Sequence, residues 1–363
     1  MLYWTQAVYL RPQALQLASE DCAVRIRSII KQCNYQQRIK TMYYIIMNPS
    51  SQSGQGLRIW KRLESVFLER KIPYRMMEST HSGHVAELAA EITSADSAGD
   101  APVNLLILGG DGTVNEALQG IRDFSSVNIG FIPTGSGNDL ARDMKLDRDP
   151  VKILESILNE NAPREADLGL LTINGSLEAT PKREGAKASG RRFFVISSGI
   201  GFDAAVCEEA LSSRLKDVLN KMKLGKLTYL GIALRQLITA RRVSCDILLD
   251  GRKTVHLNRF LFAASMIRRF EGGGFKFCPQ ADDKDGLLDL CLVGNLPKPV
   301  IFLALPTAFF GRHYLFPQIF HYRAARIEIK TSVPLWIHTD GEVYFKSDHI
   351  CLSCERQKVR FLA

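Results

Sequence analysis

The most constraining feature of this sequence is a glycine-rich turn that joins an apolar segment to a helix-like one. The segment GGDGTVNE at 109–116 directly follows the strand-like run 103–108. A strand that ends in glycines before a helix begins brings backbone N–H groups and a positive dipole end together, which favours phosphate binding. Asp111 suits a magnesium ion near that phosphate, or the fixing of the loop itself. Taken alone, the turn is equally compatible with ordinary helix capping.

The same arrangement occurs at two further places. The run 127–132 leads into PTGSGND at 133–139, and the run 43–47 leads into NPSSQSGQG at 48–56. Strand-like and helix-like segments alternate from Met42 to about Asn161, which predicts a parallel sheet with helices on both faces. Loops that follow parallel strands meet at one edge of the sheet, where open α/β sheets bind nucleotides.

The pattern changes from Ala162 onward. Short and often alternating runs occupy 166–173, 192–198, 243–249, 254–264, 287–293, 323–330 and 335–338. Such runs are typical of antiparallel strands. We therefore predict an α/β protein with a parallel-sheet nucleotide-binding domain at 42–161 and a mainly antiparallel β domain at 162–344.

Composition excludes some functions and leaves others open. The chain carries 47 basic and 38 acidic residues, for a net charge of +9. No apolar run approaches the roughly 20 residues that span a bilayer. The charge is compatible with binding to an anionic membrane surface. No pattern of interleaved basic and aromatic residues indicates nucleic-acid binding, so we expect no nucleic-acid partner. The 8 cysteines lack metal-binding spacing, which favours reduced thiols in a cytosolic protein.

Six segments in order resemble the diacylglycerol kinase catalytic-domain family, the soluble bacterial lipid kinases related to sphingosine and ceramide kinases. They are NPxxxxG at 48–54, GGDGTxNE at 109–116, PxG[ST]xND at 133–139, SGIGFD at 198–203, DxxDGxLD at 282–289 and DGE at 340–342. GGDG alone would be shared with NAD kinases and phosphofructokinases. The later segments favour lipid kinases, and the resemblance extends from about Met42 to the C-terminus.

This resemblance implies an ATP- and Mg²⁺-dependent kinase that phosphorylates a lipid alcohol, with diacylglycerol giving phosphatidic acid as the first expectation. The alternatives are another acceptor (a sphingoid base, a polyprenol or NAD) or a non-catalytic nucleotide-binding regulator. The family further implies a cytoplasmic protein that contacts the inner membrane face peripherally and binds its lipid substrate there. It also implies that the last strands, at about 345–363, return to the first domain. A homodimer is compatible with the sequence.

Residues 1–41 match none of the family segments. Apolar residues recur at helical spacing from Leu15 to Cys33, with Arg25, Arg27 and Lys31 nearby, so a weak amphipathic membrane helix is one interpretation. We favour the simpler one, in which this extension is disordered or is an artefact of a start placed upstream of Met42.

Carried over onto this chain, the family pattern assigns nucleotide binding to the glycine loops and their neighbours. The expected nucleotide-binding residues are Asn48, Ser53, Thr80, Gly109, Gly110, Asp111, Gly112, Thr113, Val114, Asn115 and Ser136. Asp340 and Glu342 share a tight turn, and residues two apart on a strand face the same side. We expect Asp340 to be the general base, with Glu342 supporting it or exchanging roles. The alternative is an Asp-Gly hairpin with an exposed Glu.

Three other features carry weaker expectations. Asp282, Asp285 and the carbonyl of Leu287 suit a hard cation, and the resemblance implies a structural magnesium there; a solvated acidic turn is the alternative. The apolar segment Leu296–Tyr314 is more typical of a core helix than of a wall for an acyl chain. Arg268 and Arg269 are candidates to meet anionic headgroups.

Overall fold

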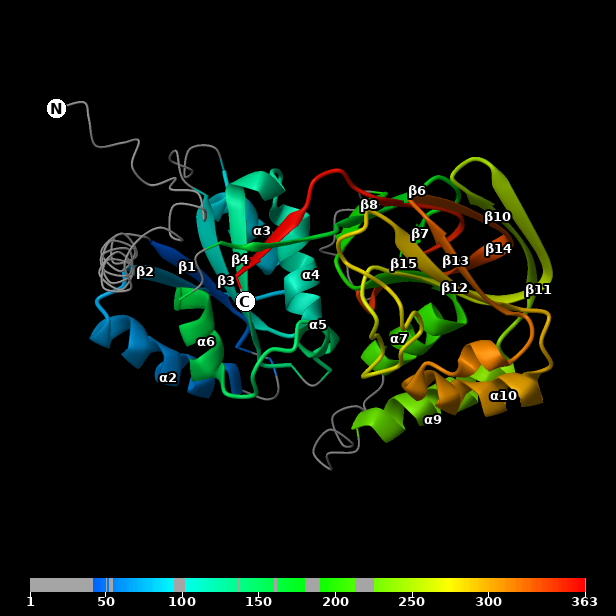
Figure 1. The fold of residues 1–363 in the computed structure, drawn as a ribbon, viewed down its shortest axis with the longest axis horizontal. Helices are drawn as coiled ribbons and strands as arrows, with labels where there is room; N and C mark the ends of the chain where they lie inside the picture. The colour runs from blue at the N-terminus through cyan, green and yellow to red at the C-terminus, as the bar shows by residue number, and fades with distance from the viewer. Residues whose placement is uncertain are drawn as a thin grey trace, which may run out of the picture.

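The computed structural model describes residues 42–49, 51, 55–94, 102–135, 137–159, 162–179, 190–212 and 225–362. The extension at 1–41, Ser53 and Ser136 lie outside these residues. Within them the chain forms two domains that lie side by side (Figure 1). The predicted fold class, a parallel-sheet domain followed by a mainly antiparallel β domain, is confirmed.

The first domain is built on a sheet in the order β2-β1-β3-β4-β16-β5. Its strands are β1 (Tyr43–Met47), β2 (Tyr74–Glu78), β3 (Val103–Gly109), β4 (Val127–Pro133), β5 (Arg164–Ala166) and β16 (Val359–Leu362). All neighbours are parallel except β5, which runs antiparallel to β16. The return of the chain is therefore shorter than we expected, because 345–354 remain in the second sheet and only β16 comes back.

Helices cover both faces of this sheet (Figure 1). They are α2 (Gln55–Glu69), α3 (His84–Ile92), α4 (Asp111–Gly120), α5 (Asp139–Asp143) and α6 (Pro150–Asn159), with a 3-10 turn η3 (Phe124–Ser126). Side chains along β3 alternate between the two faces. Leu106 and Leu108 share a core with α2 and α6, whereas Leu105 and Ile107 pack with α3 and α4. This two-sided burial explains why the strand reads as a continuous apolar run.

The second domain contains one antiparallel sheet in the order β13-β12-β11-β10-β14-β15-β6-β8. Its strands are β6 (Gly169–Ile173), β7 (Glu178–Ala179), β8 (Arg191–Phe194), β9 (Ser197–Gly201), β10 (Val243–Leu249), β11 (Lys253–Met266), β12 (Leu288–Gly294), β13 (Ile319–Ala324), β14 (Arg326–Thr339) and β15 (Glu342–Cys354). Because β9 pairs with both β11 and β14, the sheet folds over on itself around an aliphatic core.

Helices of the second domain lie on one side of its sheet (Figure 1). They are α7 (Phe202–Ser212), α9 (Gly225–Thr239) and α10 (Lys298–Thr307), followed by the 3-10 turns η4 (Ala308–Phe310) and η5 (His313–Leu315). They share a second apolar core with β11 and β12. None of the helices in the part of the chain that the structure describes is long and apolar enough to cross a bilayer.

Candidate active site

The loops after β1, β3 and β4 contact one another at the carboxyl edge of the first sheet. The Asn48 amide donates to Thr113 Oγ1 at 3.4 Å. The Thr134 N–H donates to the Gly109 carbonyl at 2.7 Å, and the Ser51 and Thr134 hydroxyl oxygens lie 2.7 Å apart. The three small-residue loops therefore form one continuous surface at the edge where a nucleotide is expected.

The first turn of α4 supplies what a phosphate site requires. Helix geometry leaves the N–H groups of Asp111 and Gly112 without an intrahelical acceptor, at the positive end of the helix dipole. Close contacts accompany two glycines at this turn. A Cβ on Gly109 would lie 2.4 Å from the Thr113 side chain, and a Cβ on Gly112 would lie 2.3 Å from Glu342 Oε1. The contact at Gly112 shows that the Glu342 carboxylate packs directly over the start of the helix.

Asp111 fixes the second glycine loop onto the first. Its Oδ2 accepts the Asp139 N–H at 2.7 Å, and its Oδ1 accepts the Leu140 N–H at 3.4 Å, so it binds the first turn of α5. Burial raises the pKa of Asp111 to about 7, and the carboxylates of Asp139 and Asp340 act in the same direction. Because burial and the neighbouring carboxylates destabilise its ionised form, a cation bound beside Asp111 would favour that form.

Val114 and Asn115 contribute to the site through the fold. Val114 is fully buried in the core of the first domain. The Asn115 side chain is also fully buried: its amide donates to Asp340 Oδ2 at 2.9 Å and to the Phe193 carbonyl at 3.1 Å. Its Oδ1 accepts from Arg192 at 2.9 Å. These polar atoms join α4 to the second domain, and the expected contact of Asn115 with the nucleotide stays a prediction.

Two other positions lie next to this edge. Thr80 follows β2, and its N–H donates to His84 Nδ1 at 3.0 Å. Glu116, the last residue of the GGDGTxNE segment, accepts the Val85 N–H at 3.0 Å at the start of α3. Glu116 thus caps a neighbouring helix, a role that the sequence did not indicate because the acceptor and donor are far apart in the chain.

The DGE segment forms a two-residue hairpin turn between β14 and β15. Thr339 pairs with Glu342, and both Asp340 and Gly341 have positive φ, 50° and 81°. This is the backbone of a type I′ turn, which Asp-Gly favours. The expectation that Asp340 and Glu342 project from one face of one strand is therefore wrong, because Asp340 belongs to the turn and only Glu342 to the strand.

Asp340 is enclosed by hydrogen-bond donors. Its Oδ1 accepts the N–H groups of Ile196 and Ser197 at 2.8 and 3.0 Å, and its Oδ2 accepts the Val195 N–H at 3.1 Å besides the Asn115 amide. Burial raises the pKa of Asp340 above its ordinary value, although these hydrogen bonds act in the opposite direction. A carboxylate whose two oxygens are occupied by four donors is well placed to hold the hairpin and has little free surface for a substrate hydroxyl.

A buried histidine, His338, stabilises the same hairpin. His338 Nδ1 accepts the Gly341 N–H at 3.2 Å, and its Nε2 lies 3.1 Å from Asp203 Oδ2 and 3.0 Å from Glu271 Oε1. Since Nδ1 accepts a hydrogen bond, Nε2 carries the proton and donates it to the carboxylates, so Nε2 has no lone pair to offer a metal ion. Sequence reasoning missed this cluster. Asp203 lies within the SGIGFD segment, but nothing in the sequence linked that segment to His338.

Two matches place the chain among known proteins. Residues 42–171 match the family model described as the diacylglycerol kinase catalytic domain. Residues 196–352 match the model described as the YegS C-terminal NAD kinase beta sandwich-like domain. The chain belongs to the diacylglycerol kinase catalytic-domain family. The resemblance read from the six segments is thereby confirmed, and the protein is a kinase of that family.

Individual relatives agree. A diacylglycerol kinase of Bacillus subtilis (strain 168) is 27% identical over 303 residues, covering 82% of this chain and 88% of the relative. A diacylglycerol kinase of Mycobacterium tuberculosis (strain ATCC 25618 / H37Rv) is 26% identical over 240 residues, covering 66% and 70%. A crystal structure of a diacylglycerol kinase from Bacillus anthracis str. Sterne has the same fold, with a TM-score of 0.60 and 16% identity over 89% of this chain and 96% of that chain.

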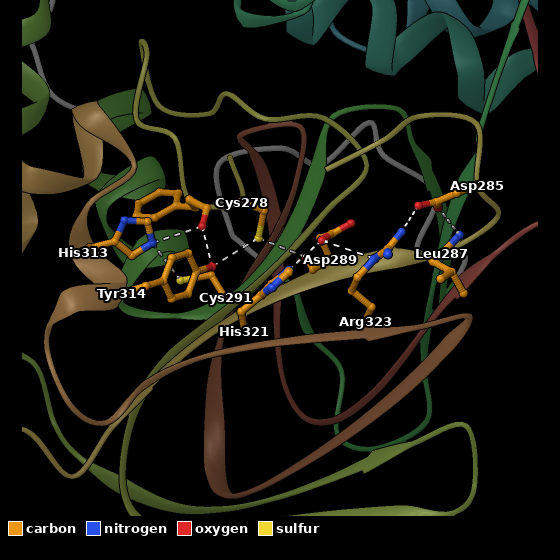
Figure 2. A network of polar contacts seen from close by, with 10 residues as sticks. Cys278, Asp285, Leu287, Asp289, Cys291, His313, Tyr314, His321 and Arg323 are labelled. Atoms are coloured by element: carbon orange, nitrogen blue, oxygen red, sulfur yellow. Dashed lines mark hydrogen bonds and ion pairs between the residues drawn. The ribbon is translucent and has the colours of Figure 1, made fainter. Parts of the chain in front are cut away.

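In this member of the diacylglycerol kinase family, an arginine occupies the acidic turn expected to hold a structural magnesium. Figure 2 shows Asp285 between Leu287, whose N–H donates to Oδ1 at 2.9 Å, and Arg323, which forms an ion pair with Oδ2. Asp282 Oδ1 accepts the Lys284 N–H at 3.2 Å. A divalent ion would meet the Arg323 guanidinium here, so these residues do not fit the expected metal.

Thermal unfolding should therefore be insensitive to magnesium at this turn. We expect the same unfolding midpoint with excess Mg²⁺ and with chelator, because Arg323 already neutralises Asp285. The pair is partly exposed, so Arg323→Leu should cost no more than about 1 kcal/mol. Calorimetry of the parent protein and of Asp285→Asn checks this. A midpoint that rises with Mg²⁺ in the parent protein but not in Asp285→Asn would restore the metal site.

Arg268 and Arg269, which we considered for headgroup binding, instead connect the two domains of the kinase. Arg268 is almost fully buried and forms ion pairs with Asp143 at 3.3 Å and Asp283 at 2.8 Å. Arg269 binds the same Asp143 at 2.8 Å. The Gly273 N–H adds a bond to Asp139 Oδ2 at 2.7 Å. These contacts fix the end of α5 and the second glycine loop against the β domain, so both arginines are corrected to an interdomain role.

Proposed function

We propose that this kinase transfers the γ-phosphoryl group of ATP to the hydroxyl of a lipid alcohol, with diacylglycerol as acceptor and phosphatidic acid as product. The observation that carries the proposal is the Glu342 carboxylate over the first turn of α4, where a Cβ on Gly112 would lie 2.3 Å from Oε1. Transfer to an alcohol needs a phosphate-binding element and a base beside it. Relatives named diacylglycerol kinase favour that acceptor.

The nucleotide phosphates would bind the first turn of α4, where Gly110, Asp111 and Gly112 present backbone. Asn48 and Thr113 hold the β1 loop against this turn. Ser53, Ser136 and Thr80 remain predicted nucleotide contacts. Mg²⁺ carried by ATP fits the Asp111 carboxylate, whose pKa of about 7 reflects burial and neighbouring negative charge. When bound, the ion would neutralise charge on the transferred phosphoryl group.

The proton of the attacking hydroxyl would go to Glu342. This residue begins β15, is only partly buried, and faces the glycine loop. Asp340 would hold the turn in place through its bonds to 195–197 and Asn115. The two carboxylates thus exchange the roles first expected of them, an exchange that the sequence left open.

Phosphorylation of a panel of acceptors tests this function. The purified kinase is incubated with labelled ATP and Mg²⁺ and with diacylglycerol, sphingosine or a polyprenol in mixed micelles, or with NAD in solution. We expect label in phosphatidic acid and little in the other products. NAD has a place in the panel because the second domain matches an NAD kinase beta sandwich-like model. Label in NADP, or consumption of ATP with none of these acceptors, would contradict the proposal.

Binding of MgATP should weaken as the pH falls below about 7. The ionised form of Asp111 is the form that binds a cation, and its pKa in the free protein is about 7. At pH 6 most of this carboxyl is protonated, so the cation must displace a proton and apparent affinity falls. Titration of a fluorescent ATP analogue from pH 5.5 to about 8 measures this. The same titration without Mg²⁺ is the control, and an equal pH slope in both would contradict the assignment.

A further inference from the structure

The second domain carries a group of large apolar side chains on its surface. Ile238, Phe302, Leu303, Phe310 and Leu315 have exposed fractions of 76%, 50%, 64%, 75% and 81%. All five belong to α10 or to elements next to it: α9, η4 and η5. We call them the α10 patch. Single exposed apolar residues need no explanation, but a group of this kind marks an interaction site.

The α10 helix is apolar on both of its faces. Its inner face enters the core through Ile301, Ala304 and Leu305. Helical spacing places 299, 302, 303 and 306 together on the outer face, and these residues are Pro, Phe, Leu and Pro. A surface helix of a globular protein has polar residues on the side away from the core. The outer face of α10 therefore has the composition of a buried surface without a partner in the described structure.

The other members of the patch adjoin this face. Lys298 at the start of α10 donates to the carbonyl of Ile238 at the end of α9. The turn η4, which ends at Phe310, follows α10 directly, and η5 packs against the same helix. In Figure 1, α9 and α10 lie side by side on the outer side of the β domain. The apolar side chains thus extend over neighbouring elements rather than along one helix alone.

The two stretches of sequence that form the patch carry charge of a single sign, and Glu209 of α7, an acidic neighbour of α9, is paired with Arg235. The sequence contains no acidic residue between Asp289 and Glu328, nor between Asp217 and Asp246. These two stretches include α9, α10, η4 and η5, and they contribute the exposed Arg241 and Arg312. A second copy of the chain docking on this face would oppose like charges. An anionic bilayer offers the complementary charge together with an apolar interior.

We propose that the α10 patch docks on the surface of an anionic lipid bilayer, with its apolar side chains in the interfacial layer and Arg241 and Arg312 against the headgroups. This proposal rests on the proposed function in that a lipid acceptor resides in such a bilayer. Because α10 and Glu342 belong to the same domain, docking would tether the domain that carries the proposed base to the membrane.

Sedimentation with sucrose-loaded vesicles tests the proposal without any catalytic step. The vesicles contain phosphatidylcholine alone or with phosphatidylglycerol, and no diacylglycerol. We expect binding to the anionic vesicles and at least about a tenfold weaker partition for F302S/L303S, given the apolar area removed from the interface. The matched control L57S/L68S changes two exposed leucines on α2 and should bind as the parent does. Arg312→Gln should lower binding to anionic vesicles only.

A soluble acceptor separates docking from catalysis. Phosphorylation of a short-chain diacylglycerol below its micelle concentration should be unchanged in F302S/L303S. Equal vesicle binding by the parent and F302S/L303S, or an equal loss in L57S/L68S, would overturn the proposal. So would a parent dimer that becomes monomeric in F302S/L303S with vesicle binding intact, because a second copy would then cover the patch. Patch-dependent vesicle binding without phosphorylation of diacylglycerol would retain the docking surface and contradict the proposed function alone.

Discussion

Replacement of Glu342 by Gln should lower kcat by about 10²–10⁴, the usual contribution of a general base, and leave the unfolding midpoint unchanged. The amide keeps the size and most contacts of the side chain over Gly112, but it cannot take a proton. Because Glu342 is only partly buried, loss of its charge should cost the fold little. Steady-state kinetics with a short-chain diacylglycerol, together with a thermal melt, measure both effects.

Asp340→Asn is the matched comparison for this experiment. The Asp340 carboxylate accepts four hydrogen bonds, three of them from backbone N–H groups. An amide NH₂ would replace one acceptor by a donor that faces other donors, at a cost of about 1–3 kcal/mol. We therefore expect this variant to lose stability as well as turnover. A stable but inactive Asp340→Asn beside an active Glu342→Gln would make Asp340 the base.

Replacement of Asp111 by Asn should lower turnover by about 10²–10³, the scale for removing one electrostatic contact from a transition state. Its amide oxygen can still accept the Asp139 N–H, which the carboxylate accepts at 2.7 Å, so the second glycine loop should stay in place. What the variant loses is the negative charge that we assign to the magnesium ion of ATP.

Asp111→Ala separates the two roles of this residue. It removes the charge and the acceptor together, so it should lose about 1 kcal/mol more stability than Asp111→Asn, as expected for a helix cap. Near-normal turnover in Asp111→Asn would remove Asp111 from the phosphoryl-transfer site.

The architecture of the first domain could be predicted because its determinants are local. Each β-α step of that domain shows an apolar run, small residues at the strand end and a helix start within one short segment. The edge at which the loops meet then follows from parallel topology. The roles of Asn115 and Asp340 could not be predicted, because they bind each other across 225 residues of sequence.

The acidic turn shows a second limit of local patterns. The two aspartates and the glycine before β12 are compatible with a turn that binds a cation. They are equally compatible with a turn whose charge is neutralised by a basic side chain. Arg323 decides between the two, and it lies 38 residues away from Asp285 on β13. For α10, sequence periodicity showed an apolar helix but gave no sign that one of its faces lies at the surface.

The most direct test measures the transfer of labelled γ-phosphate from ATP to a water-soluble diacylglycerol by the parent protein and by Glu342→Gln at equal concentration. This assay tests the proposed reaction and the proposed base together. We expect labelled phosphatidic acid from the parent protein, which depends on added Mg²⁺, and at most about one hundredth of that rate from the variant. No labelled lipid from the parent protein, or equal rates from the two proteins, would contradict a lipid kinase that works through the hairpin carboxylate over α4.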